Sequence, residues 1–134
     1  DPAKGKTLFI STCSGCHRAG GVGKDIGPDL TDIKRKLEKK TIAEAVMYPS
    51  AAIVFGYEAA TITTKKGESL YGFVIAEDKN MIVLKDAGGH RNTIVKSEIV
   101  SRKKEEQSLM PSAASLNLSE QDLADLTTFL LTLK

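Results

Sequence analysis

Two cysteines and a histidine stand close together near the start of the chain, in the order Cys13-Ser14-Gly15-Cys16-His17. The spacing C-x-x-C-H is the attachment pattern of a c-type haem. On a helical turn, residues three apart project from one face, so both sulfurs can reach one porphyrin edge and add to its vinyl groups. The imidazole of His17 then lies close enough to bind the iron. The pattern predicts one covalently attached haem c per chain, held by Cys13, Cys16 and His17.

Three other interpretations of these residues remain to be weighed. The first is a buried pair of thiols beside an incidental histidine, and the second is a redox dithiol of the thioredoxin kind, which requires a strand before Cys13. The third is half of a zinc site, which requires further ligands. The chain has 2 Cys and 2 His in total, and His90 stands alone in a Gly-rich turn. Because no strand pattern precedes Cys13 and zinc ligands are too few, haem attachment is the favoured interpretation.

The glycine-rich segment after His17 contains a Gly27-Pro28 pair followed by Asp29-Leu30. A histidine bound to iron needs an acceptor for its other ring N–H, which fixes the tautomer and raises the basicity of the ligand. Proline has no N–H but offers a carbonyl. The Pro28 carbonyl is therefore our candidate acceptor, and the alternative is an ordinary Gly-Pro turn.

A c-type haem has a second axial position, where a methionine raises the reduction potential and a second histidine lowers it. Met81 lies in a predicted strand and is expected in the core of a sheet, whereas Met47 ends a predicted helix and is expected to pack. His90 is expected in solvent. Met110 stands in a loop and is followed by Pro111, which restricts the backbone. We predict Met110 as the sixth ligand, with His90 or an open position as the alternatives.

The composition is that of one ordinary globular domain, or one domain with an insert. Of the 134 residues, 41% are hydrophobic and 27% charged, while the formal net charge of +2 implies no strong global field. Only 5% of residues are aromatic, so a bound macrocycle would add apolar surface that the side chains lack. No apolar run is long enough to span a bilayer, and no signal peptide is present. We expect a mature or excised segment whose leader or larger parent chain is missing.

Helical patterns flank a block of strand-like sequence. They predict helices over about 2–13, from Thr31 or Asp32 to about Lys39, and over 42–47 after a Thr41 cap. A last helix follows a Ser119 cap, with Asp122 at the capping-box position, and should pack on the first helix. Phe9 should pack on another helix or on the haem. The lysines and arginine around 34–40 are a solvated face, or alternatively a surface that steers an acidic redox partner.

The block between the helices reads as a β-meander or small barrel. Alternating, β-branched segments separated by Gly-containing turns predict strands over 57–64, 70–76, Met81–Lys85 and Arg91–Val95, with a short fifth strand over 99–102. This block contains no nucleotide-binding loop, no paired catalytic carboxylates and no nucleophile–base pair. Its lysines are interspersed with acidic residues, and aromatic residues are few, so nucleic-acid binding is not predicted.

In their order along the chain, these motifs resemble a class I cytochrome c. The resemblance rests on Gly5-Lys6-Thr7-Leu8-Phe9, Cys13–His17, Gly27-Pro28-Asp29-Leu30, Met110-Pro111 and the final helix. With its β block the chain is also similar to the haem-binding domain of the planctomycete and verrucomicrobial type, on the strength of the Ser108–Pro111 segment and the entry Gly56-Tyr57-Glu58. The resemblance implies that Pro28 lends its carbonyl to the ligand histidine.

The resemblance also implies an organisation and a function. It implies a mainly α cytochrome c fold, α+β overall, formed by residues 1–56 and 105–134, with residues 57–104 as an inserted antiparallel sheet. The expected role is electron transfer, as a carrier or as the electron-accepting domain of a larger dehydrogenase, rather than enzymatic catalysis. The partners would be a dehydrogenase donor and a downstream acceptor, with no nucleic acid and no membrane insertion by this segment. The expected location is periplasmic or otherwise extracytoplasmic, and the alternative function is a gas sensor or peroxidase-like enzyme with a displaceable sixth ligand.

Overall fold

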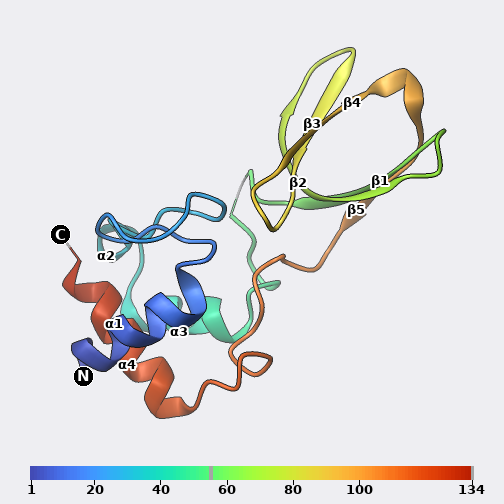
Figure 1. The fold of residues 1–134 in the computed structure, drawn as a ribbon. Helices are drawn as coiled ribbons and strands as arrows, with labels where there is room; N and C mark the ends of the chain where they lie inside the picture. The colour runs from blue at the N-terminus through green and yellow to red at the C-terminus, as the bar shows by residue number, and fades with distance from the viewer. Residues whose placement is uncertain (55, 134) are drawn as a thin grey trace. The chain divides into compact units, whose positions relative to one another are not determined.

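The structure, a computed structural model, describes residues 1–54 and 56–133 and divides the chain into two compact units (Figure 1). We call them the helical unit, Asp1–Ala52 with Met110–Lys134, and the sheet unit, Ile53–Leu109. The boundaries between the two units lie after Ala52 and after Leu109, whereas the sequence analysis expected them after residues 56 and 104. With helices in one unit and an antiparallel sheet in the other, the chain is α+β.

The helical unit begins with the N-terminal helix that the sequence predicted. Helix α1 spans Pro2–Leu8 and continues directly into a π-helical turn, η1, over Phe9–Cys13. The Asp1 side chain accepts hydrogen bonds from the first backbone amides of α1, as an N-cap should. The remaining helices are α2, α3 and α4, which span Ile33–Lys36, Lys39–Met47 and Glu120–Thr132.

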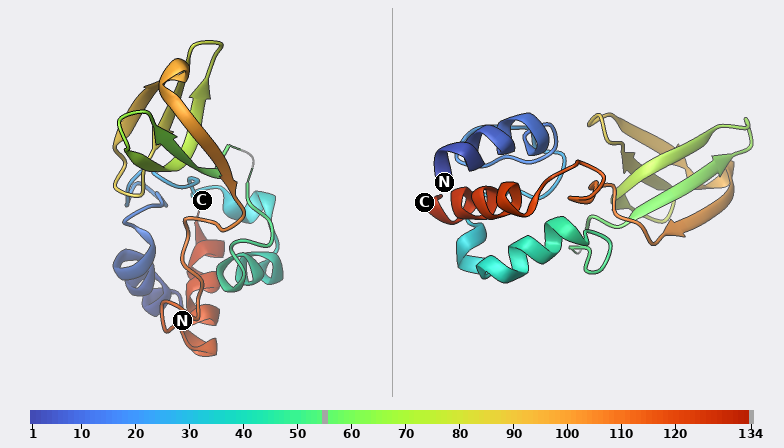
Figure 2. Two further views of the ribbon diagram at one scale, coloured as in Figure 1. Left: turned by 90° about the vertical axis from the view of Figure 1, so that its right-hand side faces the viewer. Right: turned by 90° about the horizontal axis from the view of Figure 1, so that it is seen from below.

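The first and last helices of this unit pack side by side, as predicted (Figures 1 and 2). A methyl group on Gly5 would come within 2.0 Å of the Asp125 carbonyl oxygen, so the two backbones meet where α1 has no side chain. One turn further, the rings of Phe9 and Phe129 lie 5.7 Å apart in a tilted arrangement. The buried cluster around them also includes Ile42, Leu126 and Leu130. The prediction that Phe9 packs on another helix is confirmed.

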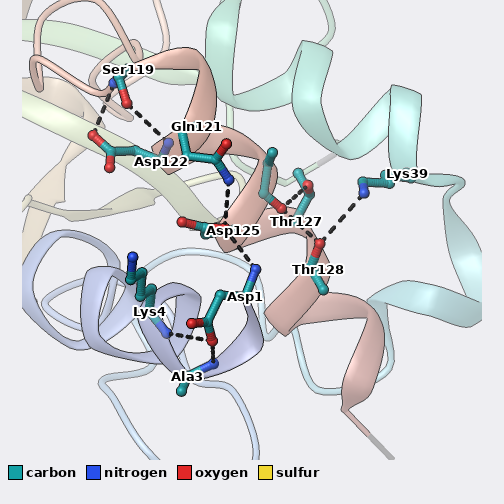
Figure 3. Close-up of polar contacts among 11 residues, drawn as sticks. Asp1, Ala3, Lys4, Lys39, Ser119, Gln121, Asp122, Asp125, Thr127 and Thr128 are labelled. Atoms are coloured by element: carbon teal, nitrogen blue, oxygen red, sulfur yellow. Dashed lines mark hydrogen bonds and ion pairs between the residues drawn. The ribbon is translucent and has the colours of Figure 1, made fainter.

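Helix α4 has the cap that the sequence predicted (Figure 3). The Ser119 hydroxyl accepts from the Asp122 amide at 3.0 Å, while the Asp122 carboxylate accepts from the Ser119 amide at 3.0 Å. Further along α4, the buried Asp125 carboxylate accepts from the amino group of Asp1 at 2.7 Å and from Gln121 at 2.9 Å. The hydrogen bond from that amino group, followed by the one from Gln121, lowers the pKa of Asp125.

Two of the predicted helix boundaries are wrong. Helix α2 is a single turn that ends at Lys36, and the Asp32 side chain makes no capping hydrogen bond. Helix α3 begins at Lys39 after an extended Glu38, so Thr41 lies inside the helix and is not its cap. The lysine-rich sequence here carries no strong start signal, and the buried Ile42 and Val46 fix the helix instead.

The sheet unit holds a five-stranded antiparallel sheet in the order β4-β3-β2-β1-β5. Its strands are β1 Ala59–Thr64, β2 Ser69–Glu77, β3 Met81–Lys85, β4 Arg91–Val95 and β5 Ile99–Glu105. The first four form a meander, and β5 returns to pair with β1. Register shifts occur in β1 at 63/64 and in β2 between Val74 and Ala76, and bulges of this kind increase strand twist. The strands are visibly curved and twisted (Figure 2).

The main hydrophobic cluster of the sheet unit is aliphatic. It consists of Ile62, Ile82, Leu84 and Ile94, with Leu70, Val74 and Ile99 packed against them. Glu77 at the end of β2 accepts two hydrogen bonds from Arg102 of β5, at 2.9 and 3.0 Å, and forms an ion pair with Lys96 at 2.8 Å. These contacts join the end of β2 to β5 and to the 3₁₀ turn Lys96–Glu98. Among the described residues, no helix has the length and apolar character needed to cross a membrane.

Candidate haem site

Cys13, Cys16 and His17 lie within one tight turn at the end of η1. The amides of Cys16 and His17 both donate to the Cys13 carbonyl, at 3.1 and 2.9 Å. Both cysteines are half-buried free thiols. Burial raises the pKa of the Cys13 thiol, which keeps it protonated and uncharged. The elements before this turn are helical, so the strand that a thioredoxin-type dithiol requires is absent from residues 1–12.

The His17 side chain is held in one orientation by a backbone carbonyl. Its Nδ1 lies 2.7 Å from the Pro28 carbonyl oxygen, and His17 is only 8% exposed. A carbonyl can only accept, so Nδ1 carries the proton and donates it to Pro28. With Nδ1 committed in this way, Nε2 is the ring nitrogen that can bind a metal.

The segment after His17 folds back along the attachment turn and brings Pro28 to the ring. Backbone amides of Lys24, Ile26 and Gly27 donate to the carbonyls of Ser14 and Cys16 at 2.7–3.0 Å. Between residues 18 and 31 the chain has no regular secondary structure apart from one isolated bridge, Ala19 to Val22.

Sequence reasoning missed two glycines in this segment that the His17 position requires. A methyl group on Gly27 would come within 2.9 Å of His17 Cε1, so the imidazole occupies the space that a side chain at this position would need. A methyl group on Gly23, whose φ is +103°, would come within 2.0 Å of the His17 carbonyl oxygen. The signal for Gly27 was its place before Pro28, because a proline that presents its carbonyl to a ring leaves little room beside it.

These residues fit a c-type haem: two thiols on one turn, a buried imidazole with one nitrogen committed to a carbonyl, and a glycine that leaves room for the ring. The comparison with known families agrees, because the sequence model of the family described as Cytochrome c matches residues 2–86. The chain belongs to the cytochrome c family. Membership implies haem c, attached covalently through Cys13 and Cys16 with His17 beside them, and a role in electron transfer. No curated protein matches the chain.

The match to the cytochrome c family ends at residue 86, so it does not extend to Met110. In the structure Met110 is half-buried and belongs to the same compact unit as His17. The loop that Met110 opens is joined to α3, because the Ala113 amide donates to the Val46 carbonyl at 2.9 Å.

The other candidate ligands lie at the end of a helix, in a strand and in a hairpin turn. Met47 is the half-buried last residue of α3. Met81 is 41% exposed at the start of β3, so the expectation that it lies in the sheet core is wrong. Its neighbours Ile82 and Leu84 occupy the core positions, and strand alternation points Met81 away from them.

The His90 side chain is 82% exposed, with Nδ1 3.4 Å from an Asp86 carboxylate oxygen, as expected for a hairpin turn. The described residues contain no cluster of three or more His, Cys, Asp or Glu side chains suited to a metal ion.

Proposed function

We propose that this cytochrome c is a monohaem electron-transfer protein in which His17 and Met110 are the axial ligands of the iron. It works either as a carrier or as the electron-accepting domain of a larger dehydrogenase. The haem supplies one-electron chemistry, with iron alternating between the ferrous and ferric states. The protein's own residues hold the ligands, exclude water and set the potential.

The observation that carries this proposal is the His17–Pro28 hydrogen bond of 2.7 Å. It fixes the tautomer with Nε2 unprotonated, and it increases electron donation from the ring. Gly27 leaves room for the ring beside the Pro28 carbonyl, because a methyl group there would come within 2.9 Å of Cε1. A ligand restrained in this way keeps its geometry through a change in iron charge, which is what fast electron transfer requires.

Met110 is the methionine that we assign to the other axial site. It is half-buried in the helical unit, and Pro111 restricts the backbone that follows it. A thioether ligand raises the reduction potential and closes the iron to small molecules. This chemistry suits an electron carrier and disfavours the alternative of a gas sensor or peroxidase.

The partners we propose are redox proteins, a dehydrogenase as donor and a downstream acceptor, which meet the cytochrome transiently. Such encounters bury less than about 1,200 Å² in total. We also propose a periplasmic or otherwise extracytoplasmic location, because bacteria attach haem c outside the cytoplasm.

The test is spectroscopic and uses the chain expressed in a host that matures c-type cytochromes. Intact mass and a pyridine haemochrome spectrum should show one haem on two thioethers. The ferric protein should be low-spin with a weak methionine–iron charge-transfer band, and the ferrous protein should bind carbon monoxide slowly. A folded but colourless chain would contradict haem attachment, and rapid carbon monoxide binding would favour the sensor. A His90→Ala variant is the control, and its spectra should match those of the parent protein.

A further inference from the structure

The π-helical turn η1 changes the direction in which the haem-attaching residues point. The Ser14 amide donates to the Phe9 carbonyl, five residues back, at 2.8 Å, whereas an α-helix would pair it with Ile10. A π-turn adds one residue to the helix, which rotates everything after it by about 100° relative to an uninterrupted α-helix. Cys13 consequently packs against the buried cluster that contains Phe9 and Leu130.

This turn diverts backbone amides from their usual acceptors, and two side-chain hydroxyls take their place. The Ser14 Oγ donates to the Ile10 carbonyl at 2.6 Å, which is the carbonyl that its own amide has left. The Thr12 Oγ1 donates in the same way to the Leu8 carbonyl, four residues back, also at 2.6 Å. Ser11 adds a longer bond of 3.1 Å to that same Leu8 carbonyl.

Thr12 is also the neighbour of the first attachment sulfur. Its Oγ1 lies 3.4 Å from Cys13 Sγ. Because the Thr12 hydroxyl proton is donated to Leu8, the Cys13 thiol is the donor in this contact. A chain of hydrogen bonds therefore runs from the Cys13 thiol through Thr12 to the Leu8 carbonyl, and it sets the orientation of the thiol before any bond to a haem exists.

We propose that Thr12 and Ser14 are positioning residues for haem attachment: their hydroxyls hold the π-turn, and the π-turn presents Cys13 to the vinyl group that it attacks. Attachment adds the sulfur to one vinyl carbon and the thiol proton to the other, so the vinyl double bond is consumed and there is no net oxidation. This inference rests on the haem attachment that family membership implies. The inference adds two hydroxyl side chains, which are not themselves haem-attaching or iron-binding groups, to the residues that attachment depends on.

The experiment compares the parent cytochrome with a Thr12→Val/Ser14→Ala variant, expressed with the haem-maturation machinery. Valine keeps the branched shape of threonine and removes only the hydroxyl. We expect a several-fold larger fraction of chains with a single thioether, detected by the pyridine haemochrome band position. We also expect about tenfold faster amide hydrogen exchange at Cys16 and His17, because two backbone-capping hydrogen bonds are lost. Exchange within α4 should not change.

Two further variants isolate the effect of position. Thr7→Val is the matched control, since Thr7 Oγ1 makes the same kind of bond to Ala3, at 3.2 Å, within regular α-helix. It should behave as the parent protein does. Thr12→Ser, made with Ser14 left in place, keeps a hydroxyl at position 12. It should show the attachment and the amide exchange of the parent protein.

Three results would be decisive against the proposals. A doubly attached Thr12→Val/Ser14→Ala variant with parental exchange at Cys16 and His17 would overturn the positioning role. Acceleration of equal size throughout α4 would overturn it as well, because it would show general destabilisation. A parent chain that takes up no haem would instead overturn the proposed function.

Discussion

The imidazole of His17 lies against the backbone of Gly27, and a methyl group there would approach Cε1 within 2.9 Å and Nδ1 within 3.2 Å. This contact and the hydrogen bond to Pro28 act on the same ring from neighbouring residues. Rotation of the ring would break the hydrogen bond to Pro28, and the ring fits in this orientation only because position 27 has no side chain. The orientation of the proposed iron ligand depends on a residue that has no side chain.

A Gly27→Ala substitution should weaken the bond between His17 and iron. The methyl group forces the ring or the loop to shift, which lengthens the hydrogen bond to Pro28. Loss of such a supporting hydrogen bond weakens metal ligation about 10–100-fold. We therefore expect His17 to dissociate from the iron, on acid titration, at a pH roughly one to two units higher than in the parent protein. Acid titration of the ferric absorption spectrum measures this shift.

The control for Gly27→Ala is Gly15→Ala, in the attachment turn itself. A methyl group on Gly15 would have no neighbouring atom within 4 Å. Gly15→Ala should leave the acid titration where it is in the parent protein. Equal midpoints for the two alanine variants would contradict a role for Gly27 in holding the ring.

Gly5→Ala should destabilise the helical unit, although alanine is the better helix former. In an exposed helix the exchange would be worth about 1 kcal/mol in favour of alanine. Here the methyl group would meet the Asp125 carbonyl oxygen, so α1 and α4 must separate. Overpacking of this kind costs about 1–3 kcal/mol. Guanidinium unfolding of the holoprotein measures the sign, and a stabilised variant would show that the two helices have room to spare.

The features predicted well from the sequence are those that neighbouring residues determine. The capping box of α4 needs only Ser119 and Asp122, which lie within one turn of each other. Strands β3 and β4 begin and end where the sequence placed them, because turn residues stand on both sides of each. The attachment motif is likewise a local pattern.

The features that the sequence did not predict depend on distant or subtle contacts. In the sequence Gly5 looks like an ordinary helix residue, and only the fold shows that it lies against the backbone of Asp125. The π-turn differs from an α-helix by one residue per turn, and the sequence 9–13 has no pattern that distinguishes the two. Met81 was misplaced because the stretch Met81–Lys85 opens with four apolar residues, so alternation could not show which of them face inward.

Removing the Ser119 hydroxyl should destabilise α4. A Ser119→Ala change deletes the acceptor of the Asp122 amide and costs about 1 kcal/mol, typical of an N-cap. Asp122→Ala removes the reciprocal bond to the Ser119 amide. The double variant should lose less than the sum of the single losses, because each change already disables part of the same box. Strictly additive losses in urea unfolding would show that the two bonds act independently.

The sheet unit should become less stable in acid because of Glu77. Hydrogen bonds from Arg102 and Lys96 lower the pKa of Glu77 from 4.5 to about 2. A carboxylate with a depressed pKa stabilises the folded state fully above its unfolded value, and that contribution is lost as the pH falls through the folded value. The loss attributable to Glu77 should therefore fall between pH 4.5 and about 2.

Comparison of Glu77→Gln with Glu68→Gln isolates this contribution. Glu68 is exposed in the β1–β2 turn, and within the described part of the chain its side chain makes no hydrogen bond or ion pair. Glu77→Gln should flatten the dependence of thermal stability on pH in that window, and Glu68→Gln should not. Added salt should reduce the difference, because the Glu77 contacts lie at the surface. An unchanged pH profile in Glu77→Gln would contradict the assignment.

Substitution of Met110 tests the proposed sixth ligand directly. Met110→Ala removes the thioether, so we expect a lower reduction potential, loss of the charge-transfer band and faster carbon monoxide binding by the ferrous protein. Met110→His should also lower the potential but keep the iron closed, since imidazole replaces the thioether. Met47→Ala is the matched control, because Met47 is also half-buried and lies in the same unit. If Met47→Ala reproduced these changes and Met110→Ala did not, the axial position would belong to the end of α3 instead.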